Sequence, residues 1–174
     1  MTKILIVPIG SVDLEVLKNI ALALEKIFHC RATLSKEMTI PEESFNYVRK
    51  QHNSTIILEK IKILKPRNSN KILGVTDVDL YFPELNFVFG EANISSGISI
   101  ISLTRLRQEF YGLRPDKRLF IERSVKEAIH EVGHTYGLSH CPHQKCIMHF
   151  SNTLRETDIK GPGFCTDCRK KLGI

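Results

Sequence analysis

The histidines at positions 130, 134 and 140 limit how this chain can fold more than any other feature. The segment reads His130-Glu131-Val132-Gly133-His134-Thr135-Tyr136-Gly137-Leu138-Ser139-His140, or HExxHxxGxxH. Residues four apart lie on one face of a helix, so His130 and His134 can direct both imidazoles at one metal ion. A continuing helix would carry the third histidine about 9 Å along its axis and round to another face. The helix must therefore end before His140 if all three are to bind one ion.

Gly137 stands where that helix is expected to end. Glycine adopts the left-handed conformation of a helix C-terminus at little cost, so the chain can turn back and bring His140 to the metal. Catalytic zinc typically takes three protein ligands and keeps one position for water. The three histidines are therefore predicted to bind a catalytic zinc. Glu131 is predicted to act as the general base that takes a proton from the zinc-bound water.

A long helix is predicted from about residue 116 to residue 136. At about 100° per residue its apolar side chains cluster in one stripe, and His130 and His134 point nearly opposite. The stripe consists of Ile121, Val125, Ala128, Val132 and Tyr136. Histidines that merely filled the core would share this stripe. One face of the helix is thus expected to pack on a sheet and the other to face a cleft.

Four of the five cysteines lie in the last 34 residues, in two close pairs separated by eighteen residues. They are Cys141, Cys146, Cys165 and Cys168. This spacing matches structural zinc sites, in which four thiolates complete a tetrahedron with no open position. Four reduced thiols in a loose tail, or two disulfides in an exported protein, are the alternatives. Cys30 is expected to be a buried spare thiol.

The two predicted zinc sites are adjacent in the sequence. Because Cys141 follows His140 directly, the cysteine site is expected to fix the loop that carries the third histidine. The tail after Gly137 reads as too irregular to bury a core of its own, and metal is the expected staple. Met148 follows shortly; a lone methionine usually fills gaps in a core.

The part of the chain before the long helix alternates strand-like and helix-like segments. Strands are predicted at 3–9, 31–34, 72–80, 87–89 and 98–103, and helices at about 16–28 and from Asn53 or Ser54 through Leu64. Ser11 or Asp13 is expected to cap the first helix, and 41–54 is expected to be mostly loop. This order is typical of an α/β or α+β sandwich. We expect a single domain over 1–174, with an N-terminal lobe (1–137) and a C-terminal lobe (138–174).

The composition is that of an ordinary globular protein, with 42% hydrophobic and 25% charged residues. There is no run of about 18 apolar residues, and the N-terminal apolar stretch lacks the cleavage site of a signal peptide. We therefore expect a cytoplasmic protein with no membrane partner. The net charge of +6 is spread along the chain, with no block of five or more like charges. A solvated basic surface is the favoured interpretation of that charge.

The motif followed by a later methionine resembles the signature of the metzincins, a clan of zinc metallopeptidases. The cysteine directly after the third histidine, the C-x4-C-x-M run and the downstream C-x-x-C make residues 130–168 similar to the archaemetzincins. The resemblance implies that Met148 forms the turn beneath the metal. It also implies two zinc ions per chain, one catalytic and one structural.

The resemblance further implies a metzincin-type domain of the α+β class. Its α/β-like N-terminal lobe would hold a twisted, mixed five-stranded sheet and the active-site helix, and zinc would staple the irregular C-terminal lobe. An edge strand, predicted at 86–92, would bind extended peptide by strand addition. The pocket wall is expected at 142–145 and 149–153, so that charge swaps at Lys145 would alter preference for acidic side chains. Tyr111 and Arg114 are candidates for stabilising the oxyanion.

The predicted function is zinc-dependent hydrolysis of peptide bonds in a peptide or protein substrate, by a monomer. A metzincin fold that binds peptides without useful turnover is one alternative. Nucleic-acid binding through the cysteine site is another, but a binding module needs no Glu131. Base-stacking aromatic residues near the cysteines are also scarce, with only Phe150 and Phe164, so no nucleic-acid partner is expected.

Overall fold

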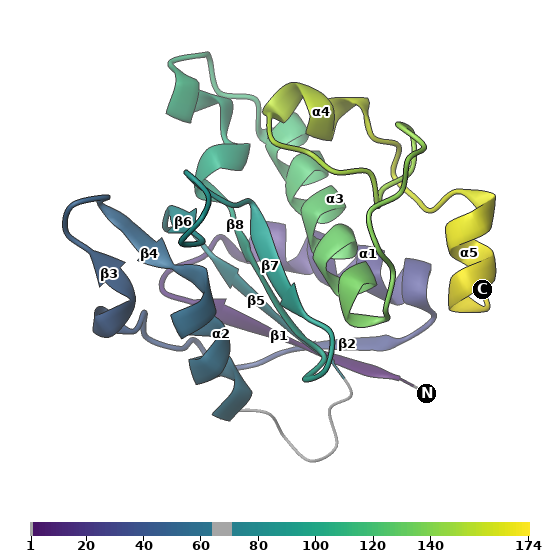
Figure 1. Cartoon of the computed structure of the whole chain (residues 1–174), viewed down its shortest axis with the longest axis horizontal. Helices are drawn as coiled ribbons and strands as arrows, with labels where there is room; N and C mark the ends of the chain where they lie inside the picture. The colour runs from purple at the N-terminus through teal and green to yellow at the C-terminus, as the bar shows by residue number, and fades with distance from the viewer. Residues whose placement is uncertain (1, 64–70) are drawn as a thin grey trace.

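The main sheet of the protein has five strands in the order β2–β1–β5–β8–β7. The computed structural model describes residues 2–63 and 71–174 (Figure 1). The strands are β1 (Lys3–Ile9), β2 (Arg31–Leu34), β5 (Lys71–Thr76), β7 (Gly90–Asn93) and β8 (Ile98–Ser102). The first four in space are parallel, and β7 runs antiparallel to β8 at the edge. This confirms the predicted α+β class with a mixed five-stranded sheet.

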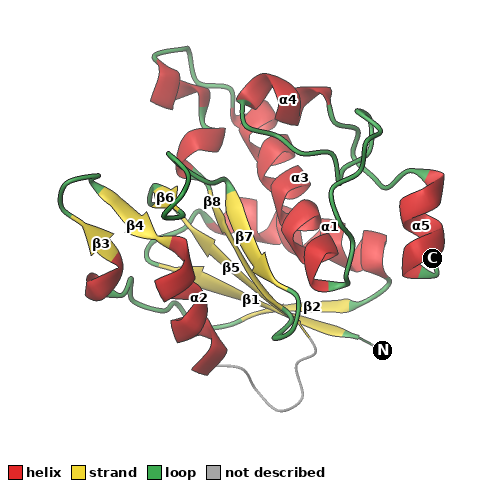
Figure 2. Ribbon diagram, in the orientation of Figure 1, coloured by secondary structure: helices red, strands yellow, loops and turns green. Residues whose placement is uncertain are grey.

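Helices cover both faces of this sheet (Figure 2). Helices α1 (Leu14–Phe28) and α3 (Lys117–Thr135) pack on one face, against Ile4, Ile6 and Leu73. Helix α2 (Ser54–Ile63) packs on the other face, against Val7, Ile9 and others. Alternate residues of a strand point to opposite faces. The three inner strands β1, β5 and β8 are therefore apolar over most of their length, because both of their faces are buried.

The helix ends follow the sequence signals closely. The Asp13 carboxylate accepts a hydrogen bond from the Glu15 N–H at 2.8 Å, which confirms the predicted cap of α1. The Asp116 carboxylate caps α3 through the Leu119 N–H at 2.9 Å. Helix α2 begins at Ser54 as predicted. Its predicted end at Leu64 lies outside the described residues.

A second, three-stranded sheet lies where the sequence indicated loop. A short 3-10 helix η1 (Glu42–Ser44) leads into β3 (Phe45–Asn46) and β4 (Gln51–Asn53), and β4 pairs in parallel with β6 (Leu80–Tyr81). The predicted strand over 72–80 is wrong in its extent, because β5 ends at Thr76. The chain leaves the sheet where the Asp79 carboxylate binds Arg105 through two hydrogen bonds of 2.7 and 2.8 Å.

The predicted strand at 87–89 is also displaced. Strand β7 occupies Gly90–Asn93 instead, and Val88 makes only an isolated bridge to Leu80. The predicted edge strand therefore coincides with β7 only over 90–92. The chain after β8 forms two 3-10 helices, η2 (Thr104–Leu106) and η3 (Gln108–Tyr111).

The C-terminal segment crosses the α3 side of the molecule as an extended chain (Figure 1). It also contains two short helices that the sequence did not predict, α4 (Leu154–Ile159) and α5 (Thr166–Leu172). Helices of this length span too few turns for their apolar residues to show a helical period in the sequence. Within residues 2–63 and 71–174, no helix combines the length and apolar character needed to cross a bilayer.

Gly74 in the central strand β5 provides a test of the packing between the sheet and α2. A Cβ atom there would lie 2.6 Å from the Ile61 Cδ1 and 2.9 Å from the Ile9 Cδ1. We expect Gly74→Ala to lower the free energy of unfolding by about 1–3 kcal/mol, because the core must shift to admit the methyl group. Urea denaturation of the zinc-loaded protein measures this. Gly163→Ala is the control, since a Cβ there meets nothing within 4 Å. Equal stability of the two variants would contradict close packing at Gly74.

Candidate metal centre and active-site cleft

The last turn of α3 brings the three motif histidines together. Gly137 has a φ of 88°, which confirms the predicted left-handed end of the helix. Its N–H donates to the His134 carbonyl at 2.9 Å, and the Leu138 N–H donates to the Gly133 carbonyl at 3.3 Å. The chain then reverses and delivers His140 to the two helix histidines. One ligand atom from each of the three rings lies within 4.8 Å of the others.

The geometry of this cluster fits a zinc ion. The Nε2 atoms of His130 and His134 lie 3.1 Å apart, close to the roughly 3.3 Å edge of a tetrahedron with Zn–N distances of about 2.0 Å. The Nδ1 of His130 donates to the Ile147 carbonyl at 2.8 Å, and that of His134 to the Leu138 carbonyl at 2.7 Å. Each Nε2 thereby keeps its lone pair for a metal.

The electrostatic environment also keeps these rings neutral. Burial lowers the pKa of His130 well below its usual range, and the neighbouring Lys160 cation adds to this effect. Burial likewise lowers the pKa of His134 and of His140. Neutral imidazole is the form that binds metal ions.

Glu131 lies in the same cleft and packs against the edge strand β7. A Cβ atom on Gly90 would lie 2.5 Å from the Glu131 Cγ and 2.6 Å from the Ile100 carbonyl oxygen. A glycine at this point of β7 therefore makes room for the Glu131 side chain. Burial raises the pKa of Glu131 well above its usual range, and the carboxylates of Glu127 and Glu91 raise it further.

Met148 is fully buried beneath the histidine-bearing end of α3. A Cβ atom on Gly133 would lie 2.6 Å from the Met148 Sδ. The Cys141 N–H donates to the Met148 carbonyl at 2.9 Å, which ties this residue to the loop of the third histidine. Met148 thus packs against α3 at Gly133, directly before His134. Its role as a Met-turn stays a prediction.

The four C-terminal cysteines form a second cluster with the dimensions of a zinc site. The Sγ atoms of Cys141 and Cys165 lie 3.7 Å apart, as do those of Cys146 and Cys168. Zn–S distances of about 2.3 Å give a tetrahedral edge of about 3.8 Å, whereas a disulfide requires about 2.05 Å. A hydrogen bond from the Cys168 backbone N–H lowers the pKa of the Cys165 thiol to about 7. Burial raises the pKa of the Cys141 and Cys168 thiols. The sulfur spacing therefore fits four thiolates on one ion and is too long for disulfides.

Cys30 stands apart from this cluster, as the sequence predicted. Its side chain is buried, and the thiol donates to the Leu24 carbonyl at 3.5 Å. Burial raises the pKa of this thiol to about 11. A thiol so protected is a poor nucleophile and a poor ligand.

One loop joins the two clusters. Cys141 follows His140, and the carbonyl that holds His130 belongs to Ile147, the residue after Cys146. The His149 ring bonds the Cys141 carbonyl through Nδ1 at 2.8 Å and closes the loop. The position of both His140 and the His130 ring therefore depends on the same short stretch of backbone.

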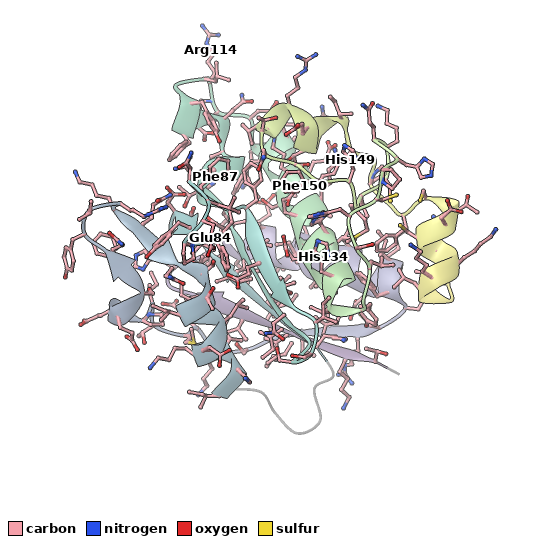
Figure 3. The ribbon with its side chains drawn as sticks, in the orientation of Figure 1. Glu84, Phe87, Arg114, His134, His149 and Phe150 are labelled. Carbon is pink, nitrogen blue, oxygen red and sulfur yellow. The ribbon has the colours of Figure 1, made fainter. Side chains whose placement is uncertain are left out.

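The cleft in front of the histidines has a volume of about 330 Å³. Apolar side chains line most of it: Phe82, Leu85, Phe87, Val88, Phe89, Ala92, Ile94 and Phe150. In Figure 3, Phe87 lies on the β6 side of β7, and His134 and Phe150 lie on its α3 side. The lining residues from 150–152 fall in the predicted wall at 149–153.

Other predicted cleft residues lie elsewhere. His143 and Lys145 line a separate hollow beside Cys146 and Cys165, so the structure gives no support to a pocket wall at 142–145 or to the predicted effect of Lys145. Tyr111 and Arg114 are exposed on and just after η3. Figure 3 shows Arg114 extending outward from the top of the molecule, away from His134. The structure does not bring these two residues to the histidines. The sequence also gave no indication that loop 82–87 would line the cleft.

Buried charges attach α3 to α4 behind the cleft. Arg123 binds both carboxylate oxygens of Asp158 at 2.7 Å. One turn further along, the Lys160 ammonium donates to the Glu127 carboxylate at 2.8 Å. Both side chains of the second pair are almost completely buried, at 0% and 4% exposed. Glu127 also lines the cleft, so this ion pair forms part of the floor of the site.

Comparison with known proteins agrees with this geometry. Residues 7–173 match the sequence pattern of Peptidase family M54. The archaemetzincin of Methanocaldococcus jannaschii is 44% identical over 170 residues, which are 98% of this chain and 92% of that protein. The archaemetzincin of Pyrococcus furiosus is 39% identical over 175 residues, covering 97% of this chain and 91% of that protein.

Solved structures give the same picture. A zinc-dependent peptidase from Methanocorpusculum labreanum superposes with a TM-score of 0.89 at 33% identity, over 97% of this chain and 99% of that one. The archaemetzincin from Archaeoglobus fulgidus, solved in complex with malonate, superposes with a TM-score of 0.85 at 37% identity, over 98% and 99% of the two chains. The fold and the family are thus those of a zinc metallopeptidase. The chain belongs to Peptidase family M54, the family of the archaemetzincins, as its C-terminal motif predicted.

The ion pair between Lys160 and Glu127 allows a test of the floor of the cleft. Lys160→Met leaves a buried carboxylate without its partner, and we expect a loss of about 3–5 kcal/mol in the free energy of unfolding. Replacing both residues, as in Lys160→Met with Glu127→Leu, should restore most of that loss. Urea denaturation of the four proteins of this cycle measures the coupling. A double variant no more stable than the single one would show that the pairing contributes little.

Proposed function

We propose that this chain hydrolyses peptide bonds with a zinc ion held by His130, His134 and His140 and with Glu131 as general base. The carrying observation is that three neutral imidazoles and one carboxylate meet in a single cleft beside the edge strand β7. Membership of a zinc-peptidase family supports the reaction class. The roles of the individual residues are our assignment.

The edge strand supports an extended substrate. Strand β7 pairs with β8 on one side only, and Gly90, Glu91 and Ala92 line the cleft. An extended peptide can add to such an edge through main-chain hydrogen bonds. Its scissile bond would then lie in front of the histidines.

Each protein group has a definite task in this scheme. When bound, zinc supplies Lewis acidity that polarises a carbonyl and makes water a nucleophile near neutral pH. The carbonyls of Ile147 and Leu138 hold the rings of His130 and His134 in the ligand tautomer. Glu131 accepts the proton of the attacking water and returns it to the leaving amine. The apolar cleft limits competing water.

The cysteine cluster has a structural role in this proposal. It would hold a second zinc with all four positions occupied, which leaves none for a substrate. We also propose a single domain acting as a monomer, with lobes at 1–137 and 138–174, and a cytoplasmic location. Cysteines kept as thiolate ligands fit a reducing compartment.

Glu131→Gln tests the assignment of the general base. The amide is nearly isosteric but accepts no proton, so we expect cleavage of a mixed peptide pool to fall by about 10²–10⁴-fold with zinc retained. Mass spectrometry of the products measures the cleavage, and metal analysis of the same samples measures the zinc content. Glu59→Gln, an exposed carboxylate on α2, is the control and should cleave normally. Full activity of Glu131→Gln would refute the assignment. If the wild type cleaves no peptide, a peptide-binding protein without turnover would be favoured.

Zinc counting tests the two-site proposal. We expect two zinc ions per chain in the purified protein by elemental analysis. Cys165→Ser should lose the structural ion and weaken zinc binding at the histidines, because the cysteine cluster holds the loop of His140. His134→Ala should lose only the catalytic ion and keep the fold. An unchanged zinc affinity of the histidine site in Cys165→Ser would refute the mechanical link.

A further inference from the structure

We propose that the loop 82–87 is the specificity wall of the cleft, that it accepts an apolar side chain of the substrate, and that the β3–β4 hairpin positions it through Arg49 and Gln51. This inference rests on the proposed function, since it assigns the wall to a peptide-binding site. It adds the chemical class of the preferred substrate side chain and two positioning residues outside the motif.

The wall is apolar and accessible from the cleft. Phe82, Leu85 and Phe87 line the same cavity as the three histidines and Glu131. Leu85 is 47% exposed, although a leucine gains by burial. Phe150 contributes a further apolar surface, 46% exposed, with its ring centroid 4.9 Å from that of His140. Exposed apolar groups that converge beside polar catalytic groups are the usual form of a small-molecule or side-chain pocket.

The acidic groups in the cleft are already engaged. Apart from Glu131, the acidic side chains among its described lining residues are Glu91 and Glu127. Glu127 is paired with Lys160 at 2.8 Å. Glu91 accepts hydrogen bonds from Ser54 and from Thr55, the latter at 3.1 Å. No described lining residue is a lysine or arginine, so the surface favours an apolar side chain over a charged one.

The hairpin holds the backbone of the wall. The loop has little support from regular structure; one turn joins the Leu85 N–H to the Phe82 carbonyl at 2.9 Å. The Arg49 guanidinium donates to the Leu85 carbonyl at 2.9 Å and to the Pro83 carbonyl at 3.4 Å. The Gln51 side-chain amide donates to the Asn86 carbonyl at 3.0 Å. Three of the six carbonyls of the loop therefore accept hydrogen bonds from the β3–β4 hairpin.

The same hairpin is coupled to the support of the Phe87 ring. The Arg105 guanidinium lies over that ring, 4.3 Å from its centroid. Arg105 is held by the Asp79 carboxylate, which also accepts a hydrogen bond from Gln51 at 3.0 Å. The Asp79 carboxylate thus links the residue that supports the Phe87 ring to a residue that holds the backbone of the loop. The second sheet therefore anchors the start of the loop, because β4 pairs with β6 directly before it.

The first experiment measures cleavage preference. The zinc-loaded full chain is given a peptide pool randomised at every position, and the cut sites are read by mass spectrometry. We expect enrichment of leucine, phenylalanine or methionine next to the cut by about tenfold or more over aspartate and lysine. Leu85→Arg should shift the preference to acidic side chains, and Arg49→Ala should flatten it and raise KM more than it lowers kcat. Leu22→Arg and Arg118→Ala, at exposed positions of α1 and α3, are the controls and should match the wild type.

A binding measurement separates this inference from the proposed function. In the Glu131→Gln background, fluorescence anisotropy reports the binding of peptides that differ only in one leucine, aspartate or lysine. If the protein prefers the leucine peptide and Leu85→Arg abolishes that preference, loop 82–87 is the specificity wall even if the wild type cleaves nothing. Binding without that preference, or no binding of any peptide, overturns the wall whatever the turnover. Arg49→Lys keeps the charge but loses the forked contact, and it should behave as Arg49→Ala. If both arginine variants retain the wild-type preference, the positioning role of the hairpin is overturned.

Discussion

The left-handed turn at Gly137 is the constraint on which the site depends. It ends α3 one residue after the helix has presented His130 and His134. The reversed chain then brings in His140, the first cysteine of the second cluster and the carbonyl that orients His130. A helix that continued through this point would separate the third imidazole from the other two. The clustering of the three histidines is therefore a consequence of where one helix stops.

The scaffold around this turn holds α3 from three sides. The main sheet and α1 bury its apolar stripe, where Ala128 and Val132 are completely buried. The cysteine cluster holds the loop beyond its end. Two ion pairs join it to α4: the buried Lys160–Glu127 pair, and a pair between buried Arg123 and the partly exposed Asp158. Pairs of this kind favour one arrangement of the elements because any other leaves a charge buried without a partner.

The sequence predicted those parts of the protein whose signals are long or chemically specific. The apolar strands, the long helix α3, the Asp13 cap of α1 and the spacing of the histidines and cysteines belong to this group. The motif spacing led to the family. Strands β3, β4 and β6 were not predicted because two or three residues show no alternation. The apolar loop 82–87 gave no sign that it would line the cleft. The ion pair between Glu127 and Lys160 joins residues 33 apart, and single-chain patterns do not reveal such a partner.

We propose that the turn at Gly137 creates an open, three-histidine zinc site beside a closed, four-cysteine one. Anomalous X-ray diffraction at the zinc edge, on crystals of the zinc-loaded protein, tests it most directly. We expect two peaks. One would lie about 2 Å from the Nε2 atoms of His130, His134 and His140, and the other about 2.3 Å from the four cysteine Sγ atoms. A zinc peak missing from the histidines, or bound there through Nδ1, would contradict it.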